Sequence, residues 1–102
     1  MPEFANPFAG NNLDRKISHE ELIRTVRYSM AAEFEAIQLY LQIADATDNP
    51  LAKEVFRDIA DEEKVHVGEL YRLLIELDPK EGDFYQEGIK EVEEEIEKLN
   101  KK

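Results

Sequence analysis

The chain has 102 residues, no cysteine and a formal net charge of −11, from 24 acidic and 13 basic residues. This length allows one small domain, and the lack of cysteine excludes disulfides and thiolate metal sites, so any metal must be held by oxygen and nitrogen. The acidic charge disfavours nucleic acid and anionic lipid as partners. Because no apolar run approaches membrane-spanning length and no secretory signal is visible, we expect a soluble, cytoplasmic protein.

The first segment, residues 1–17, contains two prolines, one glycine and three asparagines and shows no sustained hydrophobic period. Such a composition is typical of chain without regular structure. We therefore predict a flexible N-terminal arm, with Phe4 and Phe8 as docking anchors.

Two long helices are predicted next. Ser18 is followed three residues later by Glu21, which is the spacing of a capping box, so a helix should run from Ser18 to about Thr47. Asn49 can cap a second helix that begins with a proline, where a missing N–H costs nothing, and this helix should run to about Leu77. Together, residues 18–78 are predicted to form an antiparallel helical hairpin.

A third, shorter helix is predicted in residues 79–102. The letters DPKEGD should break the second helix, and Asp83 should cap a helix that ends near Leu99. No stretch alternates between apolar and polar residues in the manner of a strand. The predicted fold class is all-α.

Each helix carries an apolar stripe of expected core positions at intervals of three and four residues, the spacing of one helical face. The positions are Leu22, Val26, Met30, Glu33, Ile37, Tyr40 and Ala44 in the first helix, Ala52, Phe56, Ile59, Glu63, His66, Leu70, Leu73 and Leu77 in the second, and Tyr85, Ile89, Val92, Ile96 and Leu99 in the third. Every position is apolar or aromatic except Glu33, Glu63 and His66. We therefore expect these three side chains to point inward.

The three exceptions should also meet at one level of the hairpin. Glu33 lies 16 residues before Asn49, and Glu63 and His66 lie 14 and 17 residues after it. With a rise of about 1.5 Å per residue, all three lie about 24 Å from the turn. Glu63 and His66, three residues apart, share a helix face and can reach the same ion.

A metal ion would offset the cost of burying two carboxylates, because no lysine or arginine occupies either stripe. One Glu plus one Glu-x-x-His is half of the donor set of a four-helix carboxylate site. Two copies related by a two-fold axis would complete both the site and a four-helix bundle, so we predict a homodimer holding two metal ions. The alternative interpretation is a buried polar network that fixes helix register without any metal.

The segments AEFEAIQLY, residues 32–40, and DEEKVH, residues 61–66, resemble the ferritin-like superfamily, and most closely the encapsulated ferritins. This resemblance implies a half-ferritin hairpin that dimerises around a di-iron ferroxidase centre. It also implies an annular homodecamer carried inside the shell of an encapsulin nanocompartment.

The resemblance assigns roles residue by residue. It implies that Glu33, Glu63 and His66 are the iron ligands and that Tyr40 is the tyrosine beside the centre. Glu35 matches an acidic residue of an outer site through which metal enters, but its usual acidic partner is replaced by Ala32.

The sequence thus predicts an enzyme, a ferroxidase that oxidises iron(II) with dioxygen and feeds iron storage in the encapsulin compartment. One alternative is a rubrerythrin-like di-iron oxidoreductase. The other is a helical assembly or cargo module in which the metal, zinc for example, is structural.

Overall fold

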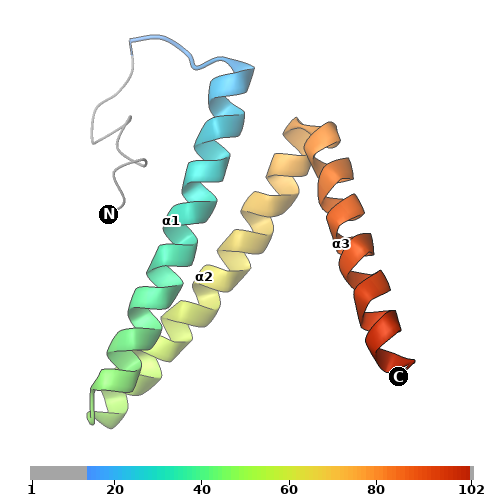
Figure 1. Ribbon diagram of the computed structural model, residues 1–102. Coiled ribbons are helices and arrows are strands. Elements are labelled where there is room, and N and C mark those ends of the chain that lie inside the picture. Colours follow the sequence, from blue (N-terminus) through green and yellow to red (C-terminus); the bar gives the residue numbers. More distant parts are fainter. Residues whose placement is uncertain (1–13, 102) are drawn as a thin grey trace.

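The computed structural model describes residues 14–101 and consists of three helices, with no strand in that range (Figure 1). The helices are α1 (His19–Ala46), α2 (Pro50–Leu77) and α3 (Pro79–Asn100). The all-α fold class is thereby confirmed, whereas the docking role predicted for Phe4 and Phe8 lies outside the described residues. No helix in the described part of the chain is long and apolar enough to cross a membrane.

Helix α1 begins with the predicted capping box. The Ser18 hydroxyl accepts a hydrogen bond from the Glu21 backbone N–H at 3.1 Å, and the Glu21 carboxylate accepts one from the Ser18 backbone N–H at 2.9 Å. Arg15 donates to both Glu21 oxygens, at 2.8 and 2.7 Å. These hydrogen bonds, from Arg15 first and then from the Ser18 backbone, lower the pKa of Glu21 to about 2.

A short connection reverses the chain between α1 and α2. Asn49 caps α2 as predicted, because its side-chain oxygen accepts a hydrogen bond from the Ala52 backbone N–H at 2.9 Å. The Lys53 ammonium donates to the Ala44 carbonyl at 2.9 Å, which satisfies an acceptor in the last turn of α1. The two helices therefore run antiparallel and lie side by side from this turn (Figure 1).

The predicted start of the third helix is wrong. Asp78 rather than Asp83 is its N-cap, with its side chain accepting from the Glu81 N–H at 3.3 Å, and Asp83 lies inside the helix. The reason is Pro79, which disfavours helical backbone at Asp78 and is itself well placed in the first turn of a new helix. The break is therefore one residue long, with Asp78 at φ −139° and ψ 84°.

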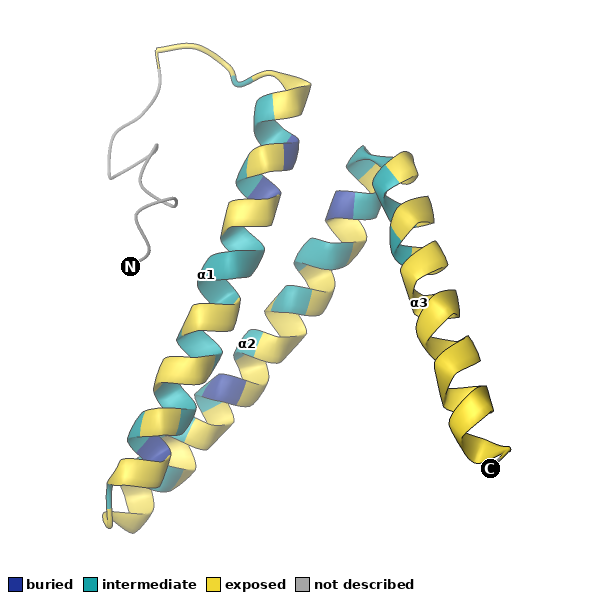
Figure 2. Cartoon of the chain, in the orientation of Figure 1, coloured by how far each residue is buried: buried dark blue, intermediate teal, exposed yellow. Residues whose placement is uncertain are grey.

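The buried core of the described chain is small (Figure 2). Its members are Ile23, Val26, Ala44, Ala60 and Leu74. Leu22, Met30, Leu70, Leu77 and Tyr85 pack against the part of this core at the open end of the hairpin. The molecule measures 57 × 45 × 20 Å, so the three helices form a flat, open arrangement. Such an arrangement buries little apolar surface.

Most of the α3 stripe is exposed, so the expectation that it is core is wrong for a single chain. Ile89, Val92, Ile96 and Leu99 are between 46% and 66% exposed. The reason is that α3 turns back at Asp78 and then diverges from the hairpin (Figure 1). Only Tyr85, at the base of the stripe, is partly covered.

Candidate metal centre

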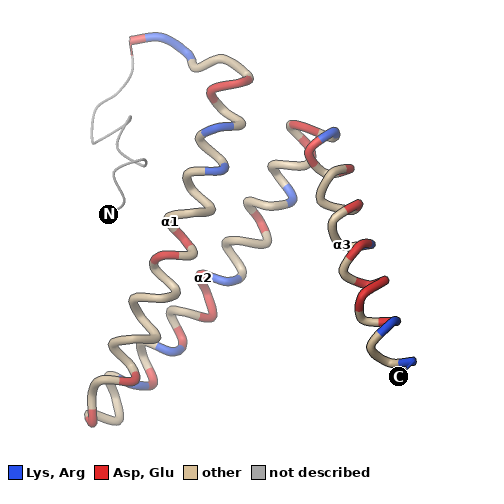
Figure 3. The backbone as a smooth tube through the Cα atoms, viewed as in Figure 1, with Lys and Arg blue, Asp and Glu red and all other residues tan. Residues whose placement is uncertain are grey.

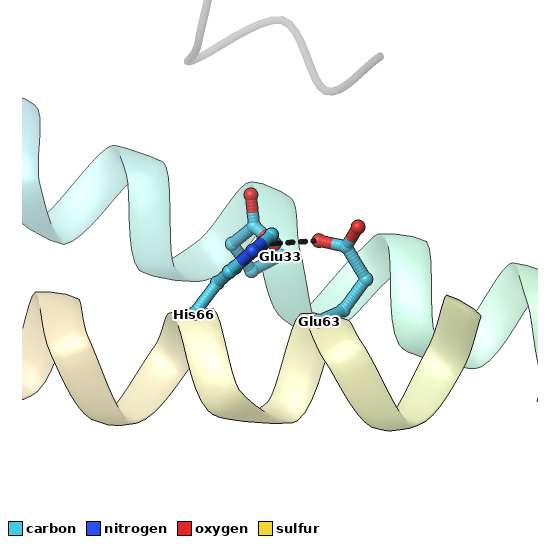
Figure 4. A group of neighbouring side chains, drawn as sticks. All are labelled: Glu33, Glu63 and His66. Carbon is cyan, nitrogen blue, oxygen red and sulfur yellow. Dashed lines mark ion pairs between the residues drawn. The ribbon is translucent and has the colours of Figure 1, made fainter. Parts of the chain in front are cut away.

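Three side chains from two helices converge midway along the hairpin (Figure 4). Glu33 comes from α1, and Glu63 and His66 come from α2. One ligand atom from each residue lies within 4.8 Å of the other two. The structure therefore brings together the three residues that interrupt the apolar stripes.

Helix geometry places these side chains. Glu63 and His66 are one turn apart on α2, so both project from the same face. The tight turn capped by Asn49 fixes the register of α2 against α1 and brings Glu33 to the same level. The structure therefore has Glu33, Glu63 and His66 at one level of the hairpin, as their similar distances from the turn in the sequence predict.

The spacing of the donor atoms fits a bound ion better than a hydrogen-bonded network. His66 Nδ1 lies 3.4 Å from Glu33 Oε2 and 3.5 Å from Glu63 Oε2. Glu33 Oε2 is buried and accepts no hydrogen bond. A metal ion holds such ligands at about 2.0–2.2 Å each, so donors around one ion are separated by up to about twice that distance.

The electrostatics of the group also favour a cation. Within residues 14–101 neither Glu33 nor Glu63 forms an ion pair with lysine or arginine. The side chains of Glu33 and Glu63 are only 27% and 18% exposed. Two enclosed carboxylates at close range repel each other unless a positive charge lies between them.

The site is open on one side. The His66 side chain is 51% exposed, so the expectation that it points inward holds for its Nδ1 atom but not for the whole ring. Val55 and Leu73, at 44% and 43% exposure, precede and follow His66 by eleven and seven residues on α2. These intervals are close to whole numbers of turns, so both apolar side chains lie on the same side of the helix as His66.

Tyr40 and Glu35, the other two predicted site residues, both lie on α1, and Glu35 is not part of the three-residue group. Tyr40 is half-buried two turns along α1 from Glu33, and its ring centroid lies 5.9 Å from that of Phe56. Glu35 is exposed, in keeping with its position on another face of α1. The roles that the resemblance assigns to these two residues stay predictions.

A family model described as rubrerythrin matches residues 25–102, more than half of the chain. The chain belongs to the rubrerythrin family. The crystal structure of the encapsulated ferritin domain from Pyrococcus furiosus superposes on this rubrerythrin-family chain with a TM-score of 0.79 at 38% sequence identity. The alignment covers 87% of this chain and 90% of that domain, so the predicted resemblance to the encapsulated ferritins is confirmed.

Two longer proteins are also similar in sequence. The ferritin-like–encapsulin shell fusion protein of Pyrococcus furiosus is 39% identical over 83 residues, which are 81% of this chain but 24% of the fusion protein. The encapsulin nanocompartment cargo protein EncC of Myxococcus xanthus is 37% identical over 89 residues, which are 87% of this chain and 67% of that protein. This chain therefore spans about a quarter of the fusion protein and two thirds of EncC.

Proposed function

We propose that this protein is a ferroxidase, which oxidises iron(II) to iron(III) with dioxygen at a di-iron centre shared between two copies. The observation that carries the proposal is the buried Glu33 oxygen without a hydrogen bond, facing Glu63 and His66 across the hairpin. Membership of the rubrerythrin family supports an iron-linked oxidoreductase over other uses of such a cluster.

The donor set argues for a second copy. One chain supplies two carboxylates and one imidazole, whereas two chains related by a two-fold axis supply four carboxylates and two imidazoles, the set of a four-helix di-iron site. The open side of the site, with exposed Val55 and Leu73 on the same side of α2 as His66, is the surface that this partner would cover. A two-fold contact uses the same surface on both copies, so one apolar strip serves both sides.

Each residue has a defined task in this scheme. Glu33 and Glu63 bind the substrate iron as hard, anionic donors, which favour iron(III) over iron(II) and so make oxidation easier. His66 Nδ1 faces the carboxylates, so it is the nitrogen that binds metal, and the imidazole must be neutral with its proton on Nε2. Tyr40 is proposed to line the site from α1.

The electron count also favours a shared centre. Each iron(II) ion gives one electron, so a pair of ions supplies the two electrons that, with two protons, take dioxygen to hydrogen peroxide. Acidic residues are distributed over all three helices (Figure 3) and would raise the local concentration of iron(II). Glu35 is proposed to belong to an outer site through which metal enters. This site is weakened because Ala32 replaces the usual acidic partner of Glu35.

The setting is proposed from the relatives. Because similar proteins are named as encapsulin cargo and as a fusion to an encapsulin shell, we propose that this chain acts inside an encapsulin nanocompartment of the cytoplasm. There it would form an annular homodecamer built from dimers and pass oxidised iron to the surrounding store.

A comparison of iron with zinc tests the proposed activity. Metal-free protein should oxidise added iron(II) in air much faster than buffer does, and zinc added beforehand should abolish this rate by occupying the same donors. Stopped-flow absorbance of ferric iron measures both. Oxidation at the buffer rate, together with an assembly held equally well by zinc, would instead identify a structural metal in a helical assembly module.

A further inference from the structure

A second polar group lies at the other end of the molecule from the α1–α2 turn, and sequence periodicity did not indicate it. Arg27 on α1 donates from Nε to both Glu81 oxygens, at 3.1 Å each, and its Nη2 also donates to Glu81. The Tyr85 hydroxyl donates to the same carboxylate from one turn further along α3. We call Arg27, Glu81 and Tyr85 the junction cluster.

Glu81 is the shielded member of the junction cluster. The Glu81 side chain is only 12% exposed, although that of Arg27 is 48% exposed. The hydrogen bond from Arg27 is the main cause of a lowered pKa at Glu81, and burial is the main cause of a raised pKa, about 12, at Tyr85. Fork-shaped arginine–carboxylate pairs are directional as well as strong, so they fix orientation.

Contacts between α3 and α2 are confined to the first turns of α3. Gly82 lies so close to α2 that a Cβ atom there would come within 3.1 Å of the Ile75 Cβ. The Tyr85 ring stacks on Tyr71 with centroids 5.6 Å apart. Every residue from 86 to 101, which covers the rest of α3 and the residue after it, is exposed (Figure 2).

The junction cluster is a polar link between α1 and α3 in the described chain. The backbone of α3 approaches that of α2 but not that of α1, so the gap is spanned by the long Arg27 side chain. Packing of a few residues at the base of α3 would leave the helix free to swing about Asp78. A directional pair from a third element would restrict that freedom.

We propose that the junction cluster is a positioning device that sets the angle at which α3 leaves the hairpin. That angle determines where α3 holds its exposed apolar side chains, Ile89, Val92, Ile96 and Leu99. The inference concerns the fold of one chain. It rests on the proposed function at one point only, the expectation that a wrong angle of α3 disturbs the packing of one copy against another.

The angle can be measured by pulsed electron spin resonance between two labels. The chain has no cysteine, so Gln38→Cys on α1 and Glu93→Cys on α3, both exposed positions, give unique attachment sites. Labelled chains are diluted into an excess of unlabelled chains of the same type, so that only distances within one chain are recorded. The parent protein should give a single narrow distance distribution.

Glu81→Gln and Arg27→Gln should each cause loss of the narrow distribution, with helix content by circular dichroism unchanged. The double variant should be no broader than either single one, because each change removes the same interaction. Arg24→Gln is the matched control, because Arg24 also lies on α1 but pairs with Glu20 of the same helix. A narrow, unshifted distribution in Glu81→Gln, or equal broadening in the control, would overturn the proposal.

Acid provides an independent test of the same pair. The groups around Glu81 are Arg27 from α1, Tyr85 from α3 and, close to Arg27, Asp78 from the junction. Because the pKa of Glu81 is lowered in the fold, its pairing is complete above the ordinary carboxyl range and is lost as the pH falls through the lowered value. The parent distribution should therefore broaden in acid, while that of Glu81→Gln should be broad throughout.

Size measurements separate this inference from the proposed function. If the junction cluster sets the angle, Glu81→Gln should shift the size distribution toward smaller species in light scattering, whereas Arg24→Gln should not. If the parent protein does not oxidise iron but gives a narrow distance distribution, only the proposed ferroxidase is contradicted and the positioning device stands. A broad distribution in the parent protein would contradict only the positioning device.

Discussion

Replacing Glu63 with alanine is expected to abolish rapid oxidation of iron(II). Loss of an outer-shell partner of a metal ligand commonly costs about 10–100-fold in activity, so removal of a ligand itself should lower the rate by at least about 100-fold. The helices should persist, because alanine favours a helix more than glutamate does. Stopped-flow absorbance of ferric iron measures the rate, and circular dichroism measures the helix content.

The same change should not destabilise the metal-free protein. Glu33 and Glu63 are enclosed carboxylates at close range with no lysine or arginine partner, so their repulsion opposes folding when no cation is bound. We therefore expect the free energy of unfolding of metal-free Glu63→Ala to equal or exceed that of the parent. Added iron(II) should stabilise the parent and not the variant.

Glu62→Ala is the matched control, because Glu62 is exposed and adjacent in sequence but lies outside the three-residue group. It removes the same charge from the same helix. Parent-like oxidation by Glu63→Ala would contradict its role as a ligand. An equal loss in Glu62→Ala would show that net charge rather than ligation explains the rate.

Leu73→Glu is expected to separate the copies and thereby stop oxidation without touching a ligand. Leu73 lies two turns beyond His66 on the same side of α2 and is 43% exposed in one chain. Placing one unpaired carboxylate in a contact between copies costs roughly 3 kcal/mol. A two-fold contact receives two of them, so the dimer should weaken by at least about 100-fold. Analytical ultracentrifugation should show smaller species, with a parallel loss of the oxidation rate.

Val65→Glu controls for the charge. Val65 is 63% exposed on α2, next to His66 in sequence but rotated further from the hairpin than Leu73. The Val65→Glu variant should retain the assembly state and the iron oxidation rate of the parent. An unchanged assembly in Leu73→Glu would mean that the second copy does not cover the open side of the site.

Local features of the fold could be predicted from the sequence because they depend on a few neighbouring residues. Ser18 with Glu21, and Asn49 before a proline, satisfy helix ends directly, and both caps form as expected. Two acidic residues compete at the third helix, however. Asp83 follows a glycine, but Asp78 precedes Pro79, and the restriction that a proline imposes on its predecessor decides the outcome.

The site could be located from the sequence because helix rise is constant. Equal distances from one short turn bring Glu33 level with Glu63 and His66, and no tertiary information is needed. How far each side chain is enclosed was not predictable in the same way. A stripe indicates which face is apolar but not whether a single chain covers it, so the half-exposed His66 was not anticipated.

The path of α3 could not be predicted from periodicity. Its direction depends on pairs far apart in sequence, such as Arg27 with Glu81, and on the close approach of Gly82 to Ile75. Charged residues at the surface of a helix do not reveal their partners. For the same reason the sequence predicts a core position for the stripe of α3, although one chain leaves most of it exposed.

A titration of metal-free protein with iron(II) in air, with the protein sized before and after, tests the shared di-iron centre most directly. We expect fast oxidation whose amplitude breaks near one iron per chain, carried by a dimer or a larger particle. Metal bound at that ratio by a monomer, or with no oxidation above the buffer rate, would contradict a shared di-iron centre.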